Sequence, residues 1–358
     1  MPAEQDPGGP AGPRDPHGRD RDAMAAALAL SEDVRGTTSP NPPVGAVILD
    51  ADGAHVGAGA TQPPGGPHAE VMALREAGDR ARGGTAYVTL EPCAHHGRTP
   101  PCAQALLDAG IAAVHYAVAD PNPAASGGGA LLREAGVDVR GGLLAADVAA
   151  GPLRAWLHRT RTGRPHVTWK YAATLDGRVA AADGTSRWIS GPTSRGEVHR
   201  IRAAADAVVA GTGTVLADDP WLTVRDADGG LAARQPLRVI VGTRGIPETA
   251  RVLDEAAETL HIRTHDAAEV LERLAARGVV DVLLEGGPTL AGAFAAAGMI
   301  DRIVAYVAPT LLGAGPTALG PAGVSTITEA HRWRVEGVTM SGDDVRITAV
   351  PVADEGGR

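Results

Sequence analysis

The segment Glu91-Pro92-Cys93-Ala94-His95-His96-Gly97-Arg98-Thr99-Pro100-Pro101-Cys102 decides the architecture of the first part of the chain. It contains the only two cysteines among 358 residues, and the tripeptide His68-Ala69-Glu70 precedes it. One imidazole (His68) and two thiolates (Cys93 and Cys102) suit tetrahedral zinc with a fourth position left open for water. Glu70 lies two residues after His68, is not needed as a ligand, and is therefore free to carry protons.

The two cysteines also fit three alternatives to a catalytic zinc site. These are a disulfide, a pair of ordinary buried cysteines, and a structural zinc site with a fourth ligand such as His95 or His96. No secretory or transmembrane segment is visible, so we expect a cytoplasmic protein, in which structural disulfides are rare. The His-x-Glu and Pro-Cys pattern is typical of the zinc deaminases of nucleobases, in which the glutamate is general acid and base.

The spacing of the cysteines narrows this hypothesis to one family. Most cytidine and tRNA-type deaminases carry Pro-Cys-x-x-Cys, whereas the two cysteines here are nine positions apart. Together with Asn41-Pro42-Pro43-Val44-Gly45 upstream and Asp120-Pro121-Asn122-Pro123 downstream, this longer loop resembles the bifunctional riboflavin-biosynthesis deaminase/reductase family (RibD/RibG). The resemblance runs from about residue 22 to about residue 352.

Length and charge restrict the classes of function. A chain of 358 residues fits two domains of about 150 to 200 residues. The net charge is −9, and five Trp, four Tyr and one Phe are few for stacking on bases, so a nucleic-acid substrate is disfavoured. A small soluble substrate fits better.

Composition and the hydrophobic pattern predict a disordered tail over residues 1–21 and two domains over 22–163 and 164–358. The resemblance implies that the first is a zinc deaminase domain and the second a reductase domain. In the first domain we expect an α/β/α sandwich, with helices over 22–34, 68–77, 102–109 and 127–135 and strands over 44–49, 55–60, 85–90, 112–119 and 137–140. The metal is then expected where the helices that begin near His68 and Cys102 converge, since helix N-termini favour anionic thiolates.

Alternating strands and helices in the second domain predict a mostly parallel sheet that ends in a hairpin. The strands are expected over 166–173, 207–210, 237–241, 259–263, 280–284, 302–307, 334–339 and 345–350, and the helices over 193–205, 266–276 and 288–297. No Gly-x-Gly-x-x-Gly follows a strand. The glycines at Gly211-Thr212-Gly213 and Glu285-Gly286-Gly287 are the candidates for a phosphate cradle.

The resemblance implies that this domain is dihydrofolate-reductase-like and uses NADPH. It implies a cofactor site formed by Ala172, Trp188, Thr214, Asp218, Gly287, Pro288, Thr289, Leu290, Ala291, Gly292 and Ala293. It implies substrate contacts from Ser186, Arg202, Leu222, Arg225 and Glu285, and Asn41 is expected to bind substrate in the first domain. Lys170, the only lysine, and Asp218 are predicted near the reducing carbon. Ala172 replaces a glycine common in the family, and Tyr171 an aliphatic residue.

The resulting hypothesis is a bifunctional enzyme with zinc and NADPH as cofactors. It deaminates a ribosylamino-pyrimidine phosphate and then reduces the ribosyl group to ribityl. Two alternatives stay open: a deaminase with a non-catalytic second domain, and a zinc-stabilised interaction or RNA-binding protein. The resemblance also implies a homo-oligomer, either a dimer or a tetramer, and the lack of a visible transmembrane segment leads us to expect no membrane partner.

Overall fold

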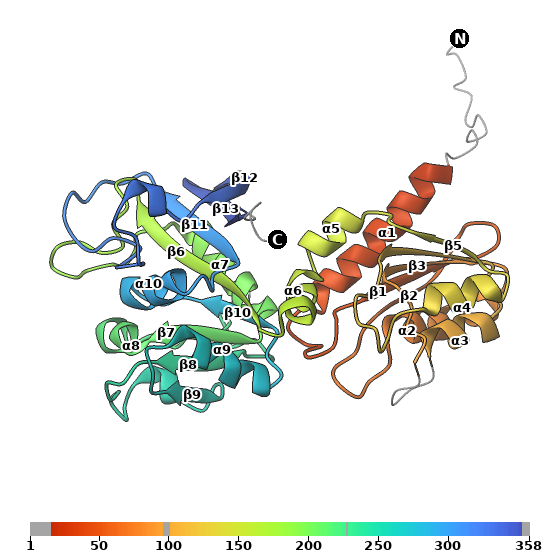
Figure 1. The fold of residues 1–358 in the computed structure, drawn as a ribbon, viewed down its shortest axis with the longest axis horizontal. Coiled ribbons are helices and arrows are strands. Elements are labelled where there is room, and N and C mark those ends of the chain that lie inside the picture. The colour runs from red at the N-terminus through yellow and green to blue at the C-terminus, as the bar shows by residue number, and fades with distance from the viewer. Residues whose placement is uncertain (1–15, 96–100, 227, 353–358) are drawn as a thin grey trace, which may run out of the picture. The chain divides into compact units, whose positions relative to one another are not determined.

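The computed structural model describes residues 16–95, 101–226 and 228–352, which divide into two compact units (Figure 1). The first unit comprises the described residues up to Val34 together with Pro43–Leu153. The second comprises Arg35–Pro42 together with the residues from Arg154 onward. Each unit has one β-sheet of its own.

The first unit is built on a five-stranded sheet of order β2-β1-β3-β4-β5. Strand β1 pairs antiparallel with β2 and β3, and β3, β4 and β5 are parallel. The elements are α1 (Pro16–Asp33), β1 (Gly45–Leu49), β2 (His55–Ala60), α2 (Ala69–Ala77), β3 (Thr85–Leu90), α3 (Cys102–Asp108), β4 (Ala113–Val118), α4 (Gly128–Glu134), β5 (Asp138–Gly141) and α5 (Ala145–Ala150).

Glycines on the first two strands let helices approach both faces of this sheet. A Cβ on Gly45 would lie 1.9 Å from the carbonyl oxygen of Ala27 in α1, and one on Gly59 would lie 2.5 Å from that of Ala69 in α2. Gly59 pairs with Ala46, the neighbour of Gly45, so the two glycines face opposite sides of the sheet. Helices α1 and α2 therefore cover opposite faces, and the close approach at Gly59 fixes the beginning of α2.

The second unit contains an eight-stranded sheet of order β12-β13-β11-β6-β10-β7-β8-β9. The six strands from β11 to β9 in this order are parallel, and β13 and β12 add an antiparallel hairpin at one edge. The elements are α6 (Arg154–Thr162), β6 (His166–Thr174), α7 (Pro192–Ala204), β7 (Ala207–Gly211), α8 (Thr212–Asp218), β8 (Leu237–Val241), β9 (Thr259–Ile262), α9 (Ala267–Ala276), β10 (Asp281–Leu284), α10 (Pro288–Ala296), β11 (Arg302–Ala308), β12 (Trp333–Ser341) and β13 (Asp344–Pro351).

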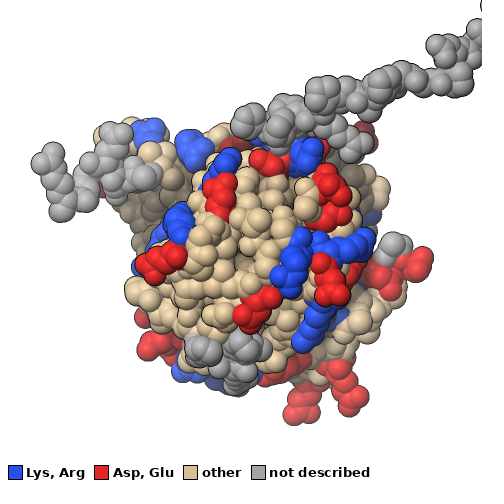
Figure 2. Space-filling model, turned by 90° about the vertical axis from the view of Figure 1, so that its right-hand side faces the viewer, with Lys and Arg blue, Asp and Glu red and all other residues tan. Residues whose placement is uncertain are grey.

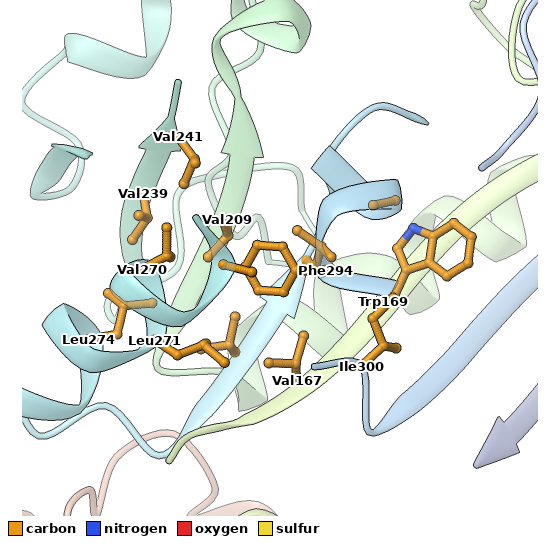
Figure 3. Close-up of a cluster of buried hydrophobic side chains, with 14 of the residues drawn as sticks. Val167, Trp169, Val209, Val239, Val241, Val270, Leu271, Leu274, Phe294 and Ile300 are labelled. Carbon is orange, nitrogen blue, oxygen red and sulfur yellow. The ribbon is translucent and has the colours of Figure 1, made fainter. Parts of the chain in front are cut away.

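The main core of this unit lies where α9 and α10 pack on the parallel strands (Figure 3). Phe294 of α10 is fully buried among Val209 of β7, Leu271 of α9 and their neighbours. Continuous burial along β7, β8 and β10 matches strands covered on both faces, as parallel sheets require. The predicted mostly parallel sheet with a terminal hairpin is confirmed.

Three features differ from the sequence expectations. Helix α1 begins at Pro16, so the prediction of a disordered tail is wrong for residues 16–21; proline is favoured in the first turn of a helix. Helices α5, α6 and α8 were not expected. The second unit begins at Arg154 and not at residue 164, because Arg159 of α6 donates to the carbonyl oxygens of Val279 (2.6 Å) and Ala275 (3.2 Å).

The segment Arg35–Pro42, which we name the strap, lies between parts of the first unit in sequence but belongs to the second unit. Arg35 forms an ion pair with Asp281 of β10 (3.1 Å), and the Ser39 hydroxyl donates to the Asp206 carboxylate (2.8 Å). Asp206 also accepts from the backbone of Val280 and Asp281, where β10 begins. The strap is therefore held at the end of the parallel sheet where its strands begin.

Candidate active sites

His68, Cys93 and Cys102 converge in the first unit. His68 is the N-cap residue of α2, Cys93 follows β3, and Cys102 begins α3. Their ligand atoms all lie within 4.8 Å of one another, with the His68 Nδ1 atom 3.2 Å from the Cys102 Sγ atom and 3.8 Å from the Cys93 Sγ atom. The structure thus brings together the three ligands that the sequence predicted, at the starts of two helices.

This geometry fits zinc. Ligand atoms bound at 2.0 to 2.3 Å around a tetrahedral ion lie roughly 3.5 to 3.8 Å apart, close to the two His68–sulfur distances. Both cysteines are free thiols. Hydrogen bonds from Cys102 and His68 lower the pKa of Cys93 to about 4, whereas donation to Cys93 and burial raise the pKa of Cys102. The pair therefore holds one proton, which a bound metal ion displaces.

A fourth protein ligand is not found among the described residues. The group that could hold a metal ion there consists of His68, Cys93 and Cys102. His95 is exposed and is not part of it, and His96 lies outside the described residues. Three ligands with an open fourth position are typical of catalytic zinc, and structural sites are closed by four.

Glu70 lies in the first turn of α2, beside the three ligands. Its side chain is buried, with 4% of the residue exposed, and it interacts with Cys102. Burial and the nearby Cys93 sulfur raise the pKa of Glu70 to about 6. A carboxyl group with this pKa exchanges protons readily near neutral pH, which is the property a general acid and base needs.

The second unit contains a pocket of about 690 Å³ at the carboxyl ends of its parallel strands. Eleven residues that the sequence assigned to the reductase site line it: Lys170, Ala172, Ser186, Thr214, Asp218, Glu285, Gly287, Pro288, Thr289, Leu290 and Ala293. Clefts outside these strand ends are where open α/β sheets bind their ligands. The pocket is large enough for much of a dinucleotide.

Glycines keep the wall of this pocket open. A Cβ on Gly286 would lie 2.7 Å from the Leu290 side chain, and one on Gly213 would lie 2.9 Å from the Arg244 guanidinium. The backbone N–H of Gly287 donates to the Thr214 hydroxyl (3.2 Å), which fixes the turn that leads into α10. The first turn of α10 therefore faces a space in which phosphates find backbone amides and a favourable helix dipole.

Lys170 and Glu285 in the pocket wall form a buried cluster of charged side chains together with Arg202. The Lys170 ammonium is 3.8 Å from the Glu285 carboxylate, which Arg202 of α7 binds through two hydrogen bonds, one of them 2.9 Å long. Burial lowers the pKa of Lys170, and the adjacent Glu285 partly offsets this effect. Burial alone raises the pKa of Glu285, but Arg202 and Lys170 lower it to about 2. Glu285 is therefore an acceptor at neutral pH.

Six further predicted residues do not line the pocket. Arg202 donates hydrogen bonds to the Glu285 carboxylate and to the carbonyl oxygen of Thr223 (3.1 Å). Arg225 donates to the carbonyl oxygen of Gly229 (2.8 Å). The other four are Trp188, which is 69% exposed, and Leu222, Ala291 and Gly292, which are buried. Asn41, predicted to bind substrate in the first domain, lies in the strap.

Arg244 and His265 line the same pocket and were not predicted. Arg244 follows β8, and His265 follows β9 and shares a hydrogen bond with Thr243 (3.2 Å). The signal that could have found them is their position: both come directly after strands whose carboxyl ends lie beside the glycine-rich turns. Arg244 has no hydrogen-bonding or ionic partner within the described ranges.

Comparisons with known proteins agree with both sites. Residues 165–347 match the family described as RibD C-terminal domain, and residues 18–118 match the cytidine and deoxycytidylate deaminase zinc-binding region. The riboflavin biosynthesis protein RibD of Mycobacterium tuberculosis (strain ATCC 25618 / H37Rv) is 59% identical over 329 residues, covering 92% of this chain and 96% of the relative.

The chain belongs to the RibD family.

RibD of Escherichia coli (strain K12) is 40% identical and covers 90% of this chain and 96% of the relative. A solved structure of Acinetobacter baumannii RibD has a TM-score of 0.83 at 39% identity, covering 94% of this chain and 99% of the other. A Thermotoga maritima structure described as a diaminohydroxyphosphoribosylaminopyrimidine deaminase/5-amino-6-(5-phosphoribosylamino)uracil reductase has a TM-score of 0.86 at 32% identity, with coverage of 94% and 99%. The expected deaminase-like and reductase-like folds are confirmed for this chain.

Two surface findings bear on partners. Among the described residues, no helix is long and apolar enough to cross a membrane. On the face in Figure 2, acidic and basic side chains alternate around an uncharged area, without a continuous basic field.

Proposed function

We propose that this chain catalyses two consecutive reactions of riboflavin biosynthesis. The first unit deaminates 2,5-diamino-6-(5-phosphoribosylamino)pyrimidin-4-one, and the second unit reduces the ribosyl group of the product to ribityl with NADPH. The observation that carries this proposal is the pairing of two sites in one chain. A His-Cys-Cys group lies beside a buried glutamate, and a glycine-rimmed pocket holds Lys170 and Glu285. The Thermotoga maritima relative is described by the same two activities.

In deamination a water molecule replaces the exocyclic amine and ammonia leaves, so a proton must pass from the water to the departing nitrogen. Zinc held by His68, Cys93 and Cys102 would supply a water molecule with a pKa near neutrality. Glu70 would accept a proton from the attacking water and return one to the leaving nitrogen. Its burial beside the ligands and its pKa of about 6 support this role.

In reduction, NADPH held in this pocket would provide the hydride for C1 of the ribose in its open imine or aldehyde form. Lys170, as a buried ammonium, can donate to an oxygen or nitrogen at that carbon, and Glu285 can accept from sugar hydroxyls. The pocket keeps Lys170, Thr214, Asp218 and Glu285 on its wall, which supports catalysis over a purely structural second domain. Contacts from Asn41, Ser186, Arg202, Leu222 and Arg225 to substrate stay proposals that rest on the family resemblance.

The charged rim of the pocket supports NADPH over NADH. Arg244 lines the pocket beside Gly213, and its unpaired guanidinium suits the phosphate that distinguishes the two cofactors. A cytoplasmic location is also part of the proposal, because two free zinc-binding thiols suit a reducing compartment. A homo-oligomer, dimer or tetramer, stays a prediction.

The test is mass spectrometry of the pyrimidine phosphate after incubation with zinc-loaded protein, with and without NADPH. Deamination adds about one mass unit, and reduction adds about two more. Glu70→Gln should prevent both gains when the diamino compound is supplied, but it should still reduce compound that was deaminated beforehand. Lys170→Met should give only the first gain. If wild-type protein gives the mass gain of deamination but no further gain with NADPH, the proposed reductase activity is refuted. If it gives no mass gain at all, the whole proposal is refuted.

A further inference from the structure

Glu91 holds two separate elements of the first unit with one carboxylate. It follows β3 directly and lies two residues before Cys93. Its Oε2 atom accepts from the backbone N–H of Asp120 (3.2 Å), which comes after β4, and its Oε1 atom accepts from the N–H of Gly129 (3.0 Å), in the first turn of α4. Both oxygens of the carboxylate are thus occupied by backbone donors.

The backbone on either side of Cys93 is joined to the end of β4 and to the loop between β4 and α4. The Glu91 N–H donates to the carbonyl oxygen of Val118 (2.9 Å), and the Ala94 N–H donates to that of Ala125 (3.0 Å). The four hydrogen bonds bracket Cys93 without involving its sulfur.

The loop also fits closely against the residue between Glu91 and Cys93. A Cβ on Gly128 would lie 1.8 Å from the carbonyl oxygen of Pro92, far inside van der Waals contact. The backbone of α4 can therefore reach Pro92 only through a glycine. A shift of the Glu91 contact would move the α4 start and the Cys93 backbone relative to each other.

We propose that Glu91 is a positioning residue for the zinc ligand Cys93. Its carboxylate locks the Glu91–Cys93 segment to the β4–α4 loop, and this sets where the Cys93 sulfur stands relative to His68 and Cys102. The inference rests on the proposed role of these three residues as zinc ligands. Glu91 touches neither zinc nor substrate in this scheme and acts only through Cys93.

The chemistry of the two donors makes glutamine a sensitive probe. A carboxylate presents two acceptor oxygens, whereas a glutamine amide presents one oxygen and an NH2 group that is only a donor. In Glu91→Gln the amide oxygen can therefore accept from only one of the two backbone N–H groups. The amide NH2 group faces the other N–H group, and because both are donors that hydrogen bond is lost. Outer partners of metal ligands commonly change metal affinity by about 10-fold to 100-fold when they are replaced.

The experiment compares full-length wild type, Glu91→Gln and the control Asp50→Asn. Asp50 holds two backbone N–H groups, those of Asp52 (3.0 Å) and Ala54 (2.8 Å), through its Oδ1 atom alone in the turn between β1 and β2, so asparagine removes the charge and can keep both hydrogen bonds. The zinc dissociation constant is measured by competition with a chromogenic chelator, and the cobalt-substituted proteins are compared by visible absorption. We expect about 10-fold weaker zinc binding and altered cobalt bands for Glu91→Gln only.

Zinc affinity within about two-fold of wild type, together with an unchanged cobalt spectrum, would overturn the proposal even if Glu91→Gln melts earlier. If that variant does not fold, Glu91→Asp carries the test, because it keeps both acceptors on a shorter side chain and should show weakened zinc binding. Wild-type zinc binding in folded Glu91→Asp would then overturn it. Failure of the proposed deaminase function is distinguishable, since zinc-loaded wild type would itself fail to deaminate.

Discussion

Replacing Arg202 by Met should destabilise the second unit in a pH-dependent way. Arg202 of α7 binds the buried Glu285 carboxylate through two hydrogen bonds, and only 8% of the Glu285 side chain is exposed. Methionine keeps much of the side-chain volume and removes the guanidinium. The carboxylate is then left with Lys170 at 3.8 Å as its partner among the described ion pairs.

The pKa of Glu285 gives the size of the effect. Burial raises it, but Arg202 and Lys170 together lower it from 4.5 to about 2. Since one pKa unit corresponds to 1.36 kcal/mol, the ionised carboxylate contributes about 3 kcal/mol at neutral pH. The folded pKa lies below the unfolded value, so this contribution is complete above about pH 4.5 and is lost as the pH falls through about 2. At pH 3.5 about 2 kcal/mol is left.

Urea unfolding followed by tryptophan fluorescence measures this effect, because all five tryptophans belong to the second unit. Because Lys170 keeps its share in this variant, we expect Arg202→Met to lose up to about 3 kcal/mol at pH 7 and up to about 2 kcal/mol at pH 3.5. Arg200→Met is the matched control: Arg200 is exposed on the same helix, and its replacement should stay within about 0.5 kcal/mol of wild type. A loss below about 1 kcal/mol at pH 7, or the same loss at both pH values, would refute the reasoning.

Three further outcomes are expected. Cys102→Ser should lower bound zinc, measured by atomic emission, from about one to below about 0.1 per chain and abolish deamination, while reduction of previously deaminated substrate continues; zinc retained at wild-type stoichiometry would contradict the ligand assignment. Arg244→Ala should raise the KM for NADPH about 10-fold and leave that for NADH unchanged, and equal effects on both cofactors would contradict a phosphate contact. Phe294→Ala, which empties a fully buried position of the core, should cost about 3 to 5 kcal/mol in the same urea assay without changing zinc content; a loss below about 1 kcal/mol would show that the core closes around the gap.

The zinc group could be predicted from sequence because its geometry is largely local. His68 and Cys102 each stand where a helix begins, and Cys93 stands just beyond a strand, so hydrophobic periodicity alone places all three near one edge of the sheet. The strands of both sheets follow from the same periodicity. The sequence could also indicate which glycine turns face the pocket, because strand ends of a parallel sheet share one edge.

Pairing between distant charged side chains could not be predicted in the same way. Arg202 was expected to hold a substrate phosphate, and the structure places its guanidinium on Glu285, 83 positions away. The choice between these partners depends on how α7 packs beside β10, which no local pattern encodes. The beginning of the second unit at α6 was missed for a similar reason, since the partners of Arg159 lie at the end of α9 and before β10.

The strap has a consequence for how the chain is made. A ribosome delivers residues in order, so Arg35 and Ser39 emerge long before their partners. Asp281 follows Pro42 by roughly 240 residues, which takes on the order of 10 to 50 seconds at typical rates of synthesis. Arg35 has no partner at Asp281 until β10 has been made, although the unit to which the residues on both sides of the strap belong ends at Leu153 and is synthesised well before that point. Assembly of the second unit must therefore recapture a segment that was synthesised near the start of the chain.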